Sequence, residues 1–192
     1  MQRFYSFMLI AAALLVSGCG STKEVFNIDG AAERNPGKCP SAFALYDAAR
    51  IVDFRGDAQA YENVGFTGEV ENVRSLCRYY GTAPIQADME ITFSLGRGPA
   101  ATQDTATYEY FVAVMRKNIA VIEKEVFPLT VTFEPGQDRV TVTEKINRII
   151  IPRKAETTSG ANFEIVTGFV LTPQQKAFNA EGKRFRISAG KR

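Results

Sequence analysis

The sequence contains no histidine and no tryptophan, and its acidic and basic side chains nearly cancel. Without histidine the chain lacks the commonest general base and the commonest metal ligand, which excludes Ser–His and Cys–His catalysis. The 23 lysines and arginines stand against 21 acidic residues, for a net charge of +2. So small a net charge gives no support for nucleic-acid binding. With 192 residues and 45% hydrophobic content, we expect a single folded domain with a sizeable core.

Long hydrophobic runs are also scarce, and the one present lies near the N-terminus. Residues 7–16, FMLIAAALLV, follow a short segment whose single charge is Arg3. Ten apolar residues are too few to cross a hydrocarbon core of about 30 Å as a helix, but they match the hydrophobic region of a signal peptide. The run leads into Val16-Ser17-Gly18-Cys19, which resembles the lipobox of bacterial lipoprotein precursors. The alternative is an N-terminal core helix that ends at a cysteine.

The lipobox resemblance implies a processing site and a location. Residues 1–18 would be a signal peptide that is removed, and Cys19 would become an acylated N-terminus carrying fatty acids such as palmitate. Gly20 in place of aspartate after the cysteine is similar to the sorting signal of outer-membrane lipoproteins. Several acyl chains anchor a protein far more firmly than one myristoyl chain. We therefore expect a body held at the outer membrane and facing the periplasm.

Cysteine is limited to three residues. If Cys19 carries lipid, Cys39 and Cys77 remain as a pair, and an exported protein enters an oxidising compartment in which disulfides form. We predict a Cys39–Cys77 disulfide that closes a loop of about 39 residues and stabilises the fold by roughly 4 kcal/mol in the chain-entropy model. A redox-active pair is the alternative, although the C-x-x-C spacing typical of such pairs is absent.

The mature chain divides into a tether and a body. Residues 19–38 are rich in glycine, asparagine, alanine and charge, without a sustained hydrophobic period, which predicts a flexible tether. As a coil this segment would span roughly 20–25 Å. Residues 39–192 would then form a single domain close to the membrane.

Apolar and polar residues alternate along much of the body. The clearest case is Ile85–Leu95, which predicts a strand with one buried and one exposed face. Further strands are expected at 44–54, 62–73, 76–80, 107–116, 119–133, 140–146, 163–171 and 184–187. Turn residues separate them at Gly96–Ala101, Lys117-Asn118 and Glu134–Gln137. This pattern predicts a mainly β protein, an antiparallel β-sandwich of the immunoglobulin-like kind, with a small closed barrel as the alternative.

One short helix is expected near the C-terminus. Thr172 at the N-cap, Pro173 at the first helical position and Gln175 three residues after the cap form a capping-box pattern, and Gly182 is a stop signal. We expect this helix to cover one end of the core.

Candidate anion or partner sites are few. Arg97 lies between two glycines whose amides are a potential anion cradle, and Lys183, Arg184 and Arg186 belong to a basic C-terminal stretch suited to anionic headgroups or an acidic partner. A plain loop and a solvated tail are the respective alternatives. Asp88 and Glu90 share the exposed face of one strand and are expected to be a solvated surface rather than an acid–base pair. No metal-ligand or cofactor motif is present.

The body also resembles a family. Cys39-Pro40, Cys77-Arg78-Tyr79 and Leu171–Gln175 are similar to segments of small bacterial envelope lipoproteins of unassigned function, a resemblance that implies no activity. The sequence therefore favours a non-catalytic binding or assembly component of the envelope, with a protein partner and no cofactor. The alternatives are a carrier or sensor that holds an apolar ligand between its sheets, and a histidine-free enzyme.

Overall fold

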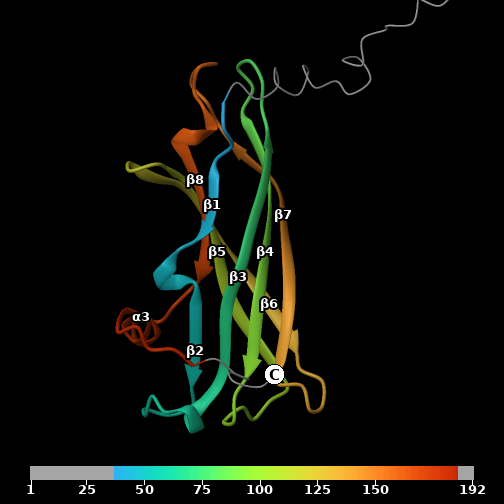
Figure 1. Cartoon of the computed structure of the whole chain (residues 1–192), viewed down its shortest axis with the longest axis vertical. Helices are drawn as coiled ribbons and strands as arrows, with labels where there is room; N and C mark the ends of the chain where they lie inside the picture. Colours follow the sequence, from blue (N-terminus) through green and yellow to red (C-terminus); the bar gives the residue numbers. More distant parts are fainter. Residues whose placement is uncertain (1–36, 186–192) are drawn as a thin grey trace, which may run out of the picture. The chain divides into compact units, whose positions relative to one another are not determined.

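Two four-stranded β-sheets pack face to face around a common apolar core (Figure 1). This computed structural model describes residues 37–185, so the predicted signal peptide, Cys19 and nearly all of the predicted tether lie outside the described residues. The strand order is β1-β8-β5-β6 in the first sheet and β2-β3-β4-β7 in the second. The predicted β-sandwich is confirmed, and the closed-barrel alternative is wrong because each sheet keeps two edges.

The first sheet is built from β1 (Ser41–Ala44), β8 (Phe163–Phe169), β5 (Thr105–Arg116) and β6 (Ala120–Thr132). The second sheet is built from β2 (Arg50–Phe54), β3 (Val64–Arg78), β4 (Ile85–Arg97) and β7 (Arg139–Ile151). Short helical turns η1 (Tyr46–Ala48), η2 (Tyr61–Asn63) and η3 (Gly160–Asn162) and one α-helix, α3 (Pro173–Ala180), complete the described residues.

All neighbouring strands run antiparallel except β1, which pairs in parallel with β8. Immunoglobulin domains distribute their strands differently, because their first, second, fourth and fifth strands share one sheet. Here β2, β3 and β4 follow one another as a meander. The likeness to immunoglobulin domains therefore lies in the two-layer architecture and not in the strand order.

Aromatic rings fill the space between the sheets. Phe93 of β4 meets Tyr110 of β5 and Phe169 of β8, with ring centroids 5.0 Å and 5.5 Å apart. These three side chains are buried, and their contacts join the two layers. Burying such large side chains supplies the main driving force for the sandwich.

Two of the predicted strands, 62–73 and 76–80, are one long strand in the structure. The pairing of β3 with β4 shifts between Val70 and Asn72. Such a bulge adds an unpaired residue, which breaks the two-residue period of the sequence without ending the strand. β6 also continues through Pro128. Proline has no amide N–H, and an edge strand tolerates it where that group would point away from the neighbouring strand.

The segment 44–54, predicted as one strand, is divided. β1 ends at Ala44, η1 turns the chain, and β2 begins at Arg50 in the other sheet. The predicted last strand at 184–187 is also wrong for its described part, because Arg184 and Phe185 lie outside any strand.

Helix α3 is confirmed with its full capping box at Thr172 and Gln175, and Gly182 follows it with a φ of 72°. The expectation that this helix covers one end of the main core is wrong. Its Phe178 instead joins Val52 and Val64 in a separate small cluster against the outer side of β2. No helix among the described residues has the length and apolarity needed to cross a membrane.

Strand directions place the loops at two ends of the sandwich. Gly37–Pro40 and the loops 79–84, 117–119 and 152–162 lie at one end, named here the Gly37 end (upper part of Figure 1). The loops 55–63, 98–104 and 133–138 lie at the opposite, far end.

Candidate functional site

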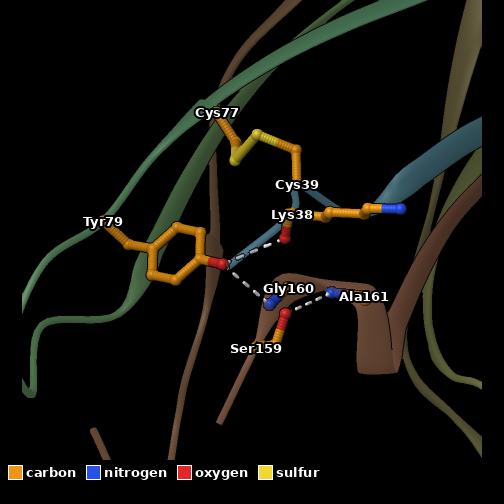
Figure 2. Close-up of a disulfide and its surroundings, with 7 residues drawn as sticks. All are labelled: Lys38, Cys39, Cys77, Tyr79, Ser159, Gly160 and Ala161. Atoms are coloured by element: carbon orange, nitrogen blue, oxygen red, sulfur yellow. Dashed lines mark hydrogen bonds between the residues drawn. A yellow bond between two sulfur atoms is a disulfide. The ribbon is translucent and has the colours of Figure 1, made fainter. Parts of the chain in front are cut away.

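The predicted disulfide is present at the Gly37 end. Cys39, just before β1, is bonded to Cys77 in β3, with a Cα–Cα distance of 5.7 Å. Figure 2 shows the Tyr79 hydroxyl beside this bridge, where it donates to the Lys38 carbonyl at 2.9 Å and accepts from the Gly160 amide at 3.0 Å. The pair is therefore part of a structural cluster that joins the two sheets. Cys19, the predicted lipidation site, lies outside the described residues.

The groups that were expected to bind an anion around Arg97 have partners within the chain. Arg97 is the last residue of β4 rather than part of a loop, and its guanidinium pairs with Asp104 at 2.8 Å. The amides that were candidate anion donors are engaged with the backbone: that of Arg97 donates to Asp138, and that of Gly98 to Gly65 at 2.7 Å. The amides of Arg97 and Gly98, which the glycine pattern made candidates for anion binding, are therefore hydrogen-bonded to backbone carbonyls of neighbouring segments.

The two C-terminal bases within the described residues, Lys183 and Arg184, are also engaged. Lys183 pairs with Glu181, and Arg184 pairs with Glu69 of β3 at 2.5 Å. Lys183 and Arg184 both lie on the outer side of the second sheet, beside Gly96 of β4. Successive residues of a strand face opposite sides of the sheet, so Arg97 faces the other side from Gly96. Arg97 therefore faces away from Lys183 and Arg184, and the structure does not bring them together. Arg186 lies outside the described residues.

The carboxylates of the β4 surface have structural partners. Asp88 accepts a hydrogen bond from the Arg148 amide at 2.9 Å, and Glu90 pairs with Lys145 at 3.0 Å. Their side chains are spaced along an open sheet face, and each is held by a different group on β7. This arrangement suits surface pairing across strands.

A concave feature lies between the two sheets at their β6 and β7 edges. A cleft of about 290 Å³ opens there, named here the β6–β7 cleft. It is lined by Val112, Val114, Glu123, Glu125 and Phe127 from the first sheet and by residues 146–150 of β7. Its walls are mainly aliphatic, and charged groups lie among them. This combination is typical of sites that bind an apolar ligand in a defined orientation.

Register explains why β6 presents two different faces. Glu123 pairs with Val114 and Glu125 with Val112, so these carboxylates point toward the cleft. Lys124 between them points to the outer face, where its ammonium lies 4.4 Å from the centre of the Phe111 ring. The cleft side of β6 is therefore acidic next to aliphatic side chains.

A bulge in β7 shapes the other wall. Ala87 pairs with Ile149 and Met89 with Ile146, so Asn147 and Arg148 together oppose Asp88. Arg148 has a φ of 62°, a conformation that costs a non-glycine residue on the order of 1 kcal/mol. Bulges of this kind redirect side chains and often lie beside functional sites.

A hydrogen bond between the sheets lies next to the cleft. The Tyr110 hydroxyl donates to Glu144 of β7 at 3.4 Å, and its ring stacks on Phe127, with centroids 5.4 Å apart. Burial, and then the nearby charge and hydrogen bond of Glu144, hold the pKa of Tyr110 well above its ordinary value of 10.0. Burial, followed by the charge of Asp53, also raises the pKa of Tyr108. Both phenols therefore remain protonated donors at neutral pH.

Arg153 is the residue that the sequence analysis missed. Its guanidinium donates to the carbonyls of Ala83, Gly81 and Tyr80 in one loop and of Glu156 and Thr158 in another. It also lies over the Tyr79 ring, 4.7 Å from its centre. No sequence pattern signals this role, because the two loops lie about 70 residues apart.

Two further observations complete the description of the site. Within residues 37–185, no group of three or more histidine, cysteine, aspartate or glutamate side chains has a metal-binding arrangement. No family model, curated protein or solved structure matches this chain.

Proposed function

We propose that this protein is an outer-membrane lipoprotein, anchored through Cys19 on its periplasmic face, that binds an extended segment of an envelope partner in the β6–β7 cleft and catalyses no reaction. The observation that carries the binding role is the cleft itself, a concave aliphatic site between two sheet edges. The anchoring role rests on the lipobox pattern at Val16–Cys19.

The edge of β6 supports an extended partner. Among the described residues, β6 has a single neighbouring strand, β5, and its first seven residues, 120–126, are all exposed. Val121, Ile122 and Val126 are about half exposed, an unusual apolar content for a free edge. An added strand would pair with the backbone of β6 and place alternate side chains in the cleft, the recognition mode called β-augmentation.

A second copy of this chain fits β6 poorly in the three registers centred on Glu123, Lys124 or Glu125. Two-fold antiparallel pairing centred on Lys124 places Lys124 opposite itself and Glu123 opposite Glu125. Centring on Glu123 or Glu125 places that glutamate opposite its own copy. Like charges directly opposite each other destabilise a strand pair. A partner with basic and apolar residues complements this edge better.

The anchor is tested by the Cys19→Ser variant. We expect it to lose acylation and to leave the membrane fraction, because the anchor requires the thiol. Fractionation of cells that express the variant, with mass spectrometry of the N-terminal peptide, measures both effects. An N-terminal peptide of the parent protein in which Cys19 carries no acyl chain would show that the anchoring proposal is wrong.

The binding role is tested by in-cell photocrosslinking. A crosslinking amino acid at Glu125, on the cleft wall, is expected to capture a defined partner, whereas the same amino acid at the exposed Thr141 on the outer face of β7 is the matched control. Substitution Val114→Phe, which fills the cleft, should abolish capture at position 125. Equal capture at both positions, or capture that persists after filling, would contradict a partner site in the cleft.

A second candidate function uses the same cleft. Its aliphatic lining, with Glu123, Glu125 and Arg148 among the lining residues, also suits an apolar small ligand, as a carrier or sensor requires. Native mass spectrometry of protein released from membranes distinguishes the two. A bound lipid lost in Val114→Phe supports the carrier, and a crosslinked polypeptide at position 125 supports the partner.

A further inference from the structure

The two ends of the sandwich carry opposite charge. In Gly37–Pro40 and the three loops of the Gly37 end, four residues are basic and one, Glu156, is acidic. The basic residues are Lys38, Lys117, Arg153 and Lys154. The three loops of the far end contain one base, Arg55, and five acids, Asp57, Glu62, Asp104, Glu134 and Asp138. A chain of nearly zero net charge has thus separated its charges along the strand direction.

Apolar side chains are exposed among the bases of the Gly37 end. Tyr80, in the β3–β4 turn, is 64% exposed, and Ile119, in the β5–β6 turn, is 72% exposed. Figure 1 shows the β5–β6 turn (olive) projecting from the rest of the sheet. Exposed tyrosine and aliphatic residues next to lysine and arginine are typical of surfaces that contact the headgroup region of a bilayer.

We propose that the Gly37 end rests on an anionic lipid surface, with Tyr80 and Ile119 in the headgroup region and Lys38, Lys117 and Lys154 near lipid phosphates. The proposal deepens the proposed function and rests on its anchoring part, because Gly37 is the point at which the described body continues toward Cys19. The acidic far end then points away from the membrane. This gives the tethered body one preferred orientation.

Charge complementarity favours an anionic lipid surface as the partner of the basic Gly37 end. Basic groups near an anionic bilayer each contribute about 1 kcal/mol, and the attraction falls off within a Debye length of about 8–10 Å. A tether of roughly 20–25 Å keeps the body close enough for such contacts to form repeatedly. Lys183 and Arg184 do not compete for this role, since they lie outside the Gly37 end, where they pair with Glu181 and Glu69. Lys117, at the Gly37 end, lies 4.0 Å from Glu164, and its side chain is still 54% exposed.

The first test measures vesicle binding by the chain that begins at Gly20, secreted without its acyl chains. Vesicles of phosphatidylcholine containing phosphatidylglycerol are compared with vesicles of phosphatidylcholine alone. The triple variant Lys38→Gln/Lys117→Gln/Lys154→Gln should bind the anionic vesicles on the order of 100-fold more weakly than the parent. The control triple Lys145→Gln/Lys176→Gln/Lys183→Gln removes the same charge from exposed sites elsewhere and should bind like the parent.

Each outcome decides the proposal. Selective loss in the first triple supports it. Equal loss in both triples would show non-directional charge attraction, and failure of the parent to prefer anionic vesicles would show no lipid contact; either result overturns the proposal. Thermal unfolding of both triples identifies any variant that fails to fold, in which case the single substitution Lys117→Gln replaces the triple.

The second test exploits the absence of tryptophan. Tyr80→Trp places a single indole at the Gly37 end, and Tyr46→Trp places one at a site that is 71% exposed in η1. With anionic vesicles, the emission of the first variant should shift to the blue, and that of the second should not. A shift in both variants, or in neither, would contradict the proposed orientation.

These tests are independent of the anchor. A parent protein whose Cys19 carries no acyl chain would refute acylation while leaving the vesicle result intact. Conversely, a confirmed anchor with no vesicle binding by the unacylated chain would refute the lipid-facing end alone.

Discussion

Arg153 connects two loops that their strands alone would leave independent. Its planar guanidinium reaches five backbone carbonyls and lies against the ring of Tyr79. A lysine has one compact ammonium with three donors and lacks the fork that spans two loops. The identity of this side chain therefore matters more than its charge.

We predict that Arg153→Lys lowers the free energy of unfolding by about 1–3 kcal/mol, because several half-buried carbonyls lose their donors. Urea denaturation measures the loss, and hydrogen exchange should show faster opening of residues 79–84 and 152–162. The neighbouring exposed variant Lys154→Ala is the control, with an expected change within about 0.5 kcal/mol. Equal stability of Arg153→Lys and the parent would contradict the role assigned to the guanidinium.

The buried phenols make stability depend on pH in the alkaline range. Since the pKa of Tyr110 in the folded chain lies above 10.0, the unfolded chain loses its phenolic proton first as the pH rises. The contribution is fully present below about pH 10 and is lost above it. Tyr108 acts in the same direction.

We therefore predict that the free energy of unfolding falls above pH 10, by up to about 1.4 kcal/mol per pH unit for each buried phenol. In Tyr110→Phe the decline should be less steep by up to that amount. Urea titrations at several pH values on both sides of pH 10 measure the slope. An unchanged slope in both Tyr110→Phe and Tyr108→Phe would show that these phenols ionise freely in the folded protein.

Helix α3 is held in place by side-chain amides as well as by apolar contacts. Asn179 donates to the carbonyls of Asp47 and Arg50 at 2.9 Å and 2.8 Å, and Gln175 donates to Val52 at 3.2 Å. Gln175 also completes the capping box with Thr172. Gln175 thus both caps the N-terminus of the helix and hydrogen-bonds the helix to β2.

We predict that Thr172→Ala destabilises the fold by about 1 kcal/mol, since the Gln175 amide loses its side-chain acceptor. Gln174→Ala, at an exposed position of the first helical turn, is the matched control and should change stability by less than about 0.5 kcal/mol. Chemical denaturation of the two variants measures the difference. Equal effects would show that the cap contributes nothing specific.

Signals that act within one element were predictable from the sequence. The alternation of Ile85–Leu95, the capping box at Thr172 and the pairing of Cys39 with Cys77 all appear in the structure. Apart from this disulfide, which the count of cysteines indicated, contacts between distant segments were not. Bulges at Val70 and at Asp88 interrupt the two-residue period, and the β6–β7 cleft exists because separate sheets diverge at that edge. The acceptors of Arg153 are backbone carbonyls, which every sequence contains.

The described β-sandwich has linked sheets on one lateral side and a cleft on the other. The disulfide and the Tyr79 hydrogen bonds join the sheets near β1 and β3, while the β6 and β7 edges border a cleft. The covalent link between the sheets therefore lies away from the proposed binding site. Elements that bind partners are commonly drawn from the less stable part of a fold.

We predict that replacing both cysteines, as Cys39→Ala/Cys77→Ala, lowers the free energy of unfolding by roughly 4 kcal/mol, because the unfolded chain regains the freedom of a loop of about 39 residues. Denaturation of the oxidised parent and the double variant measures this difference. Alkylation of the unreduced parent should detect no thiol at Cys39 or Cys77. Labelling of either cysteine would contradict the bridge in the exported protein.

The position of the bridge also determines how the body responds to force. A pull applied at Gly37 reaches Cys39 before it reaches β1, a strand of only four residues at the edge of its sheet. The covalent bond passes this load to Cys77 in β3, the 15-residue strand inside the other sheet. β3 pairs along most of its length with β4, so the tension is shared by many hydrogen bonds at once. In the proposed arrangement, movement of the membrane relative to a bound partner would thus load the paired length of β3 and leave β1 in place.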